Sequence, residues 1–345
     1  MIEKLRAHYG FERMPFGRNL APGMLHRHES HNQAVARISW CIGKRSIGVV
    51  TGEVGAGKTV SVRTCLDALD PSKYSVVHIP NPMIGVRGIH EMIVNAFGQA
   101  PSHLGSRLTV QTGKVLLSER EERGRTPVLV VDEAHLMSYE QLESIRMLTN
   151  QGMDQDSPLS CLLVGQPTLR RTMKLAVLAA LEQRTALRYT MPGMTSKETT
   201  SYVAHHLKIA GRPDQLFTED ALTLIHTTSR GYPRAVNNLS LQALAAAFAP
   251  GKNLVDEAAA RASVSEVVGD RVPVHDIAIG EDVAVEVPRD VLRRPQVAAW
   301  LMEDADVRAR SSTPTNPRAP RGTSTQPGQG RRCLGAAGLG PIAPP

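Results

Sequence analysis

The sequence has few aromatic residues and few cysteines, and each shortage excludes a class of function. Aromatic residues make up 4% of the 345-residue chain, so a platform on which nucleic-acid bases stack is not expected. The four cysteines form no Cys-x-x-Cys pair, and they are Cys41, Cys65, Cys161 and Cys333. Neither a zinc site nor a disulfide framework is therefore predicted, and this cysteine usage fits a reducing cytoplasm.

Long apolar runs are also missing from the chain. Residues 1–6 have no apolar core behind them, unlike a secretory signal. The longest apolar stretches, such as residues 243–249, are much shorter than the ~20 residues that a membrane-spanning helix needs. We therefore expect a cytoplasmic protein without membrane insertion.

Three histidines, His26, His28 and His31, lie close together near the start of the chain. No cysteine and no second cluster of ligands accompanies them in the sequence. A metal site at these histidines is therefore not favoured.

The charge balance is basic, with a formal net charge of +7. Such a balance favours nucleic acid or acidic partners. With so few aromatic residues, any contact with double-stranded DNA should be made to the phosphate backbone, and its strength should depend on salt.

Residues 52–59 form a complete G-x-x-x-x-G-K-[ST] motif, called the phosphate loop below. Its residues are Gly52, Glu53, Val54, Gly55, Ala56, Gly57, Lys58 and Thr59. The glycines allow backbone N–H groups to surround phosphate oxygens, the lysine places a cation on the outer phosphates, and the threonine hydroxyl can bind Mg²⁺. Residues 46–50 are an apolar, β-branched run and residues 59–66 contain no glycine or proline. The motif therefore lies between a predicted strand and a predicted helix, which is the context it needs.

A second apolar strand, residues 127–131, ends in two carboxylates, Asp132 and Glu133. In parallel sheets ligands bind at the carboxyl ends of the strands. We predict that Asp132 helps to hold Mg²⁺, directly or through water. Glu133 should orient or deprotonate the attacking water.

Three more strands are predicted at residues 74–80, 159–165 and 186–191. Gln166 follows one of them and is a candidate to reach the γ-phosphate or the water. Asn81 follows another and could hold Glu133 in an inactive position, although a turn residue before a proline is the favoured interpretation.

The order of these motifs resembles the AAA+ ATPases, with an Asp-Glu-Ala-His string at 132–135 as in the origin-recognition type of ATPase domain. More narrowly, residues 8–265 are similar to ExeA-like secretion ATPases and to transposon helper ATPases of the TniB and TnsC type. The supporting phrases are Tyr-Gly-Phe at 9–11, Met-Pro-Phe at 14–16, Leu-Val-Gly-Gln-Pro at 163–167, Leu-Glu-Gln-Arg at 181–184 and Gly-Tyr-Pro-Arg at 231–234.

The resemblance implies ATP and Mg²⁺ as ligands and assigns roles to further residues. Arg184 should be the arginine finger that reaches the nucleotide of a neighbouring subunit, with Arg188 as the alternative. Arg234 should be the second sensor, at the start of a helix in the helical lid. The family phrase usually begins Leu-Arg-Gln-Arg, and here Glu182 replaces its first arginine.

The predicted fold is α/β: an AAA+ core with a parallel five-stranded sheet flanked by helices, followed by a small all-helical lid. Residues 1–45 should be an N-terminal segment that covers the nucleotide, 46–193 the core and 194–268 the lid. Residues 269–345 should form a variable, largely disordered basic tail.

The function predicted from the sequence is that of a DNA-associated helper ATPase that regulates or recruits a transposase or integrase. It would act as a homo-oligomer, in a ring or filament, on double-stranded DNA. The reason is that ExeA-like proteins typically carry a membrane segment beyond the ATPase, and none is recognised here. The alternatives are an accessory ATPase of a secretion or envelope-assembly system, a non-catalytic ATP-sensing scaffold, or a replication-initiator-like loader.

Overall fold

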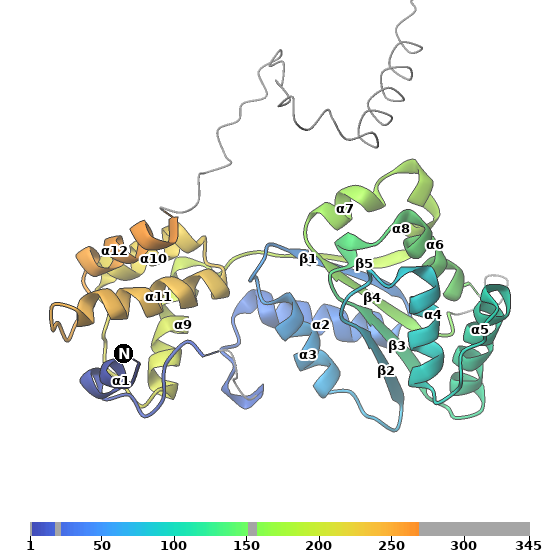
Figure 1. The fold of residues 1–345 in the computed structure, drawn as a ribbon, viewed down its shortest axis with the longest axis horizontal. Helices are drawn as coiled ribbons and strands as arrows, with labels where there is room; N and C mark the ends of the chain where they lie inside the picture. The colour runs from blue at the N-terminus through green and yellow to red at the C-terminus, as the bar shows by residue number, and fades with distance from the viewer. Residues whose placement is uncertain (1, 18–21, 151–156, 269–345) are drawn as a thin grey trace, which may run out of the picture. The chain divides into compact units, whose positions relative to one another are not determined.

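The computed structural model describes residues 2–17, 22–150 and 157–268. It contains a sheet surrounded by helices and a separate group of helices (Figure 1). The strands are β1 (Ile47–Gly52), β2 (Tyr74–Ile79), β3 (Thr126–Val131), β4 (Ser160–Gly165) and β5 (Thr185–Met191). Each of them lies within two residues of its predicted position. Their positions confirm the predicted alternation of strands and helices.

Helices precede, connect and follow the strands. The α-helices are α1 (Ile2–Tyr9), α2 (Glu29–Gly43), α3 (Lys58–Asp67), α4 (Gly85–Ala96), α5 (Gly105–Glu121), α6 (Tyr139–Leu148), α7 (Thr168–Met173), α8 (Ala179–Arg184), α9 (Ser196–Ile209), α10 (Glu219–Ser229), α11 (Pro233–Phe248) and α12 (Glu257–Val268). Short 3₁₀ helices are η1 (Pro22–Met24), η2 (Ala134–Leu136) and η3 (Ala176–Leu178).

The five strands form one parallel sheet in the order β2-β3-β4-β1-β5. Parallel neighbours need crossover connections, and the helices between the strands provide them. β1, which leads into the phosphate loop, lies between β4 and β5. This arrangement confirms the predicted α/β fold and brings the carboxyl ends of β1, β3 and β4 to one edge of the sheet.

Successive strand residues pack into different cores, because side chains in a strand point alternately to opposite faces. In β3, Val128 and Val130 pack with α2 and α3, whereas Leu129 and Val131 pack with α4, α5 and α6. The sheet is therefore a middle layer covered on both faces (Figure 1). Continuous apolar strands are what this burial requires.

The helical region contains α9 to α12, which share one apolar cluster with α1. α9 starts with a capping box, in which Thr195 and Glu198 bond to each other's backbone N–H, as their spacing predicts. Thr218 caps α10, as predicted, because its side-chain oxygen accepts a hydrogen bond from the backbone N–H of Ala221. Between core and helices, the backbone N–H of Met194 donates to the carbonyl of Gly231 at 2.9 Å.

The N-terminal segment, residues 1–45, contributes to both cores. α1 packs in the helical cluster, where the Tyr9 hydroxyl donates to the carbonyl of Leu244 at 3.0 Å. α2 packs on the sheet through Ala34, Ile38 and Ile42. The predicted disordered tail, 269–345, lies outside the described residues. No helix in the described part of the chain has the length and apolarity needed to cross a membrane.

Candidate active site

The phosphate loop joins the end of β1 to the start of α3, as the sequence predicts. Gly55 and Gly57 have φ angles of 83° and 93°, in the left-handed region that favours glycine. A Cβ atom on Gly55 would lie 2.5 Å from the Cβ of Arg234, so this position has no room for a side chain. Such a glycine backbone allows N–H groups to face phosphate oxygens at the start of a helix.

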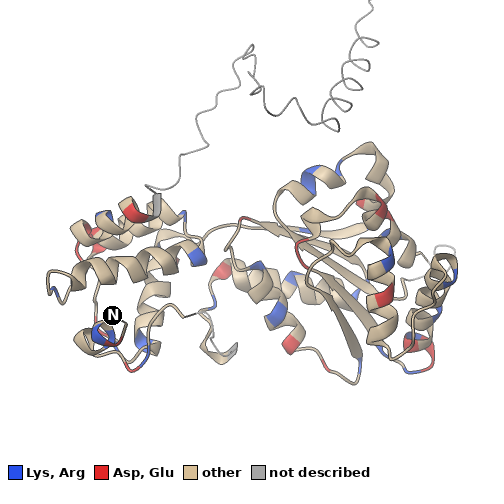
Figure 2. Cartoon of the chain, in the orientation of Figure 1, with Lys and Arg blue, Asp and Glu red and all other residues tan. Residues whose placement is uncertain are grey.

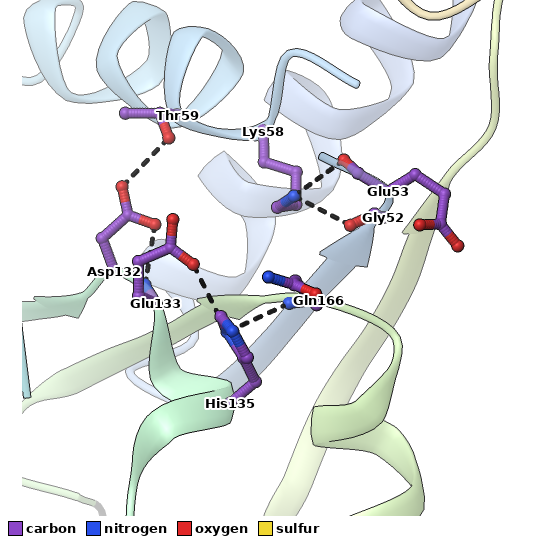
Figure 3. Close-up of polar contacts among 8 residues, drawn as sticks. All are labelled: Gly52, Glu53, Lys58, Thr59, Asp132, Glu133, His135 and Gln166. Atoms are coloured by element: carbon purple, nitrogen blue, oxygen red, sulfur yellow. Dashed lines mark hydrogen bonds and ion pairs between the residues drawn. The ribbon is translucent and has the colours of Figure 1, made fainter. Parts of the chain in front are cut away.

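The ammonium group of Lys58 lies against its own loop. Its Nζ donates to the carbonyl oxygens of Gly52 at 2.8 Å and Glu53 at 3.0 Å (Figure 3). Burial lowers the pKa of Lys58 from its ordinary value, and neighbouring carboxylates, led by Glu133, oppose this shift. The result is a half-buried cation whose carbonyl partners can be exchanged for phosphate oxygens.

Thr59 and Asp132 meet across the site. The Thr59 hydroxyl donates to Oδ2 of Asp132 at 3.0 Å (Figure 3). A hydroxyl and a carboxylate at this separation fit the oxygen ligands of Mg²⁺, which usually binds one or two protein groups together with substrate phosphates and water. The described residues contain no group of three or more histidine, cysteine, aspartate or glutamate side chains that could hold a metal by themselves.

Glu133 follows β3 in an unusual backbone conformation. Its φ of 51° and ψ of 33° are left-handed, which is uncommon for a residue other than glycine. Its Oε2 lies 3.3 Å from Nδ1 of His135, and the backbone N–H of Gln166 donates to the same nitrogen at 3.5 Å (Figure 3). Asn81 does not contact Glu133: its Oδ1 accepts from the backbone N–H of Met83 at 3.0 Å, as expected for a turn residue.

A cavity of about 480 Å³ collects most of the predicted site residues. They are Val54, Gly55, Gly57, Lys58, Thr59, Glu133, Gln166 and Arg234. Ala56 is buried, and Gly52, Glu53 and Asp132 reach the cavity through their hydrogen bonds to Lys58 and Thr59. A larger hollow of about 890 Å³ lies along α5 and contains none of these residues. The fold therefore brings the two halves of the predicted site together.

Histidines line another part of the same cavity. His26, His28 and His31 face it from the N-terminal segment, and His206 faces it from α9. Burial lowers the pKa of His28 and of His206 to about 4, so both rings are neutral at pH 7. Nδ1 of His31 is hydrogen-bonded to the Ser61 hydroxyl at 2.9 Å.

Three buried polar atoms in this part of the cavity have no hydrogen-bond partner among the described residues. They are Nδ1 of His26, Nε2 of His31 and Oδ1 of Asn237, and all three residues line the cavity. Buried polar atoms normally find partners. A flat, uncharged ring with polar edges, such as a nucleobase, would supply them.

The candidate arginines occupy different places. Arg184 ends α8, as predicted, and its Nη2 donates to Oδ1 of Asn150 at 2.7 Å. Arg188 pairs with Glu182 at 2.8 Å, so the substituted glutamate holds the alternative arginine. Neither lines the cavity formed by the described residues of this chain. Arg234 does line it, and its guanidinium is one of the charges that lower the pKa of Lys58, after burial.

Two features of the site were missed by sequence reasoning. The histidine of the Asp-Glu-Ala-His string had no assigned role, although it is the side chain that approaches Glu133. The sequence suggests only a disfavoured metal site for the cluster at residues 26–31, whereas this cluster lines the cavity that reaches the phosphate loop. The short spacing of His26, His28 and His31 is a signal that the sequence displays. The contribution of His206 to the same cavity is not, because this residue is distant in the sequence.

The fold is that of the AAA+ proteins, and the site resembles the nucleotide site of an AAA domain. Residues 42–173 match the model of a protein family described as AAA domain. Among solved structures, Cdc6p from Pyrobaculum aerophilum has a TM-score of 0.56 at 18% identity, covering 73% of this chain and 70% of that chain. The Aeropyrum pernix ORC2 protein, in ADPNP–ADP complexes, has a TM-score of 0.55 at 18% identity, covering 77% and 74%. At these identities the likeness concerns the fold alone.

The chain is also related to a curated protein. General secretion pathway protein A from Aeromonas hydrophila is 32% identical over 268 residues, which are 76% of this chain and 48% of that protein. The chain thus spans about half the length of this relative. These comparisons confirm the AAA+ resemblance and favour its secretion branch over the transposon-helper branch.

Proposed function

We propose that this protein binds ATP with Mg²⁺ and hydrolyses it, as the accessory ATPase of a secretion or envelope-assembly system. The observation that supports ATP hydrolysis is the convergence of Lys58, Glu133 and Gln166 on one cavity at the carboxyl edge of the sheet. The relation to general secretion pathway protein A supports the kind of system.

The proposed chemistry assigns one task to each side chain. Lys58 exchanges its carbonyl partners for the outer phosphates and stabilises their charge. Thr59 and Asp132 would hold Mg²⁺, which neutralises charge between the phosphates when bound. Glu133 accepts a proton from the water that attacks the γ-phosphorus, and the bond to the bridging oxygen of ADP breaks.

Two further residues respond to the nucleotide in this proposal. Gln166, at the tip of β4, orients the γ-phosphate or the water. Arg234 reaches the phosphates from α11, and its loss of contact after hydrolysis would alter how the helical region is held. The backbone N–H of Arg234 donates to the carbonyl of Gly55 at 3.3 Å, which already connects α11 to the phosphate loop.

The base would occupy the histidine-lined end of the cavity. His28 and His206 are neutral there, and the unpartnered atoms of His31 and Asn237 are available to the ring edges. The cavity volume of about 480 Å³ is within the range of small-molecule sites.

The first test is hydrolysis by the wild-type chain compared with Glu133→Gln. We expect the variant to bind ATP with unchanged affinity but to turn over at least about 100-fold more slowly, because its amide cannot accept the proton. Glu121→Gln, which alters an exposed carboxylate on α5, is the matched control and should behave like wild type. Equal turnover by Glu133→Gln and wild type would show that another group handles the water.

A DNA-bound transposase helper is the second candidate, and the net charge of +7 favours it. Figure 2 shows acidic and basic residues interspersed on both the core and the helices in that view. Hydrolysis should be measured with and without double-stranded DNA at two salt concentrations. Salt-sensitive stimulation would favour the DNA-bound helper, whereas turnover indifferent to DNA, together with a membrane-bound partner, would favour the secretion role.

A further inference from the structure

His135 lies between the two strand tips that carry the proposed chemistry. It belongs to η2, two residues after Glu133, and its side chain is 12% exposed. Its Nδ1 approaches Oε2 of Glu133 at 3.3 Å and the backbone nitrogen of Gln166 at 3.5 Å (Figure 3). One ring nitrogen therefore faces both the water-activating carboxylate and the end of β4.

This nitrogen cannot serve both partners in the same state. With a lone pair, Nδ1 accepts the hydrogen bond from Gln166 and repels the carboxylate. With a proton, it donates to Glu133, and the Gln166 N–H loses its acceptor. The ring therefore connects the backbone of Gln166 with the Glu133 carboxylate.

The surrounding backbone leaves the side chain of Glu133 as the part that can move. The Glu133 N–H donates to Oδ1 of Asp132 at 2.9 Å, and its carbonyl accepts from Leu136 at 2.9 Å. The tip of β4 also packs tightly against η2, since a Cβ atom on Gly165 would lie 3.0 Å from the backbone nitrogen of His135. With the backbone fixed on both sides, the contact with the imidazole decides how the Glu133 carboxylate is oriented.

We propose that His135 is a positioning residue that orients the Glu133 carboxylate and couples it to Gln166. This inference rests on the proposed function, because it assumes that Glu133 activates water. Catalytic bases are commonly oriented by a third group in this way. Without the imidazole, the exposed carboxylate of Glu133 would sample orientations that do not face the water.

The test compares His135→Ala with wild type in the full-length protein, measuring kcat, KM and the affinity for ATP. We expect kcat to fall by about 10- to 100-fold while ATP affinity changes less than about twofold, because misplacing a catalytic group affects the chemical step. His135→Asn places an amide near the position of Nδ1 and should recover part of the lost kcat. His103→Ala removes an exposed histidine and is the matched control.

A double variant separates positioning from general damage to the fold. Combined with Glu133→Gln, His135→Ala should cause little further loss, because the group that it orients can no longer act. If the double variant instead shows the product of the two single-variant losses in kcat, the role of His135 is overturned. It is also overturned if His135→Ala is as active as wild type. If His135→Ala does not fold, the comparison of His135→Asn with wild type in the same two backgrounds decides: an additive loss overturns the proposal. Absence of hydrolysis by the wild-type chain would instead overturn the proposed function, and the positioning role with it.

Discussion

The two ends of the cavity are built in opposite ways. At the phosphate end, each charged side chain has a polar partner: Lys58 donates to the carbonyls of its own loop, Asp132 accepts from the Thr59 hydroxyl, and Glu133 approaches the ring of His135. At the base end, buried histidines carry no charge at pH 7, because burial lowers the pKa of His28 and His206 to about 4. Charge suits the polyanionic part of a nucleotide, and neutral polar rings suit its base.

The largest expected effect comes from removing the cation of the phosphate end. Lys58→Ala should raise the dissociation constant for ATP by about 100-fold or more, since the outer phosphates lose a half-buried charge partner. Lys114→Ala, at an exposed position on α5, is the matched control. Isothermal titration with ATP and Mg²⁺ measures both, and retained affinity in Lys58→Ala would remove the phosphate-loop assignment.

The second prediction concerns Arg184 and asks whether the phosphate end needs a residue from a neighbouring subunit. Arg184 binds Asn150 and does not line the described cavity, so we propose that it acts on a neighbouring subunit. Arg184→Ala should then lower turnover by about 10- to 1,000-fold, with ATP affinity preserved.

Mixing variants reveals the direction of this contact. A Lys58→Ala subunit lacks its own nucleotide but keeps Arg184, so mixing it with Arg184→Ala should restore part of the activity. Arg188→Ala is the comparison, because Arg188 is already paired with Glu182. Recovery with Arg188→Ala but not with Arg184→Ala would assign the role to Arg188.

The buried histidines of the base end should make the folded protein less stable in acid. The folded pKa of His28 and of His206 is about 4, below the ordinary value of 6.5, so the unfolded chain binds more protons between these values. Stability contributed by each histidine is complete above pH 6.5 and is lost as the pH falls towards 4. At pH 5 the free energy of unfolding should be lower than at pH 7 by about 2 kcal/mol for each.

Urea unfolding of wild type and His28→Gln at pH 7 and pH 5 measures this difference. The variant should lose less stability on acidification than wild type, because one buried titrating ring is absent. His103→Gln serves as the control at an exposed position. An equal acid loss in all three proteins would contradict the assignment of buried neutral rings.

Local signals predicted most of the fold. The five strands are short apolar runs bounded by turn residues, and the capping box of α9 and the Thr218 cap of α10 depend on residues three positions apart. The phosphate loop was recognisable because its glycines, lysine and threonine are contiguous. Such features depend on neighbours in the chain, which a sequence displays directly.

The contacts that individual side chains make in the folded protein were harder to predict. Asn81 was considered as the residue that holds Glu133, but its side chain bonds to Met83 in its own turn. His135 makes that approach instead, because η2 turns its ring towards the carboxylate and the tip of β4. The sequence gives no direct sign of this competition, since both candidates follow strands that end at the same edge.

The sequence by itself determined the order of strands and motifs, the nucleotide-binding loop and the acidic strand end, because each depends on contiguous residues and regular periodicity. Only the tertiary structure decided which side chains face Glu133, that Glu182 holds Arg188, and that His26, His28 and His31 share a cavity with His206. The physical reason is that hydrogen bonds and burial act over a few ångströms, and the folded backbone decides which side chains come within that range, whether they are near in the chain, as Glu133 and His135 are, or far apart, as His28 and His206 are.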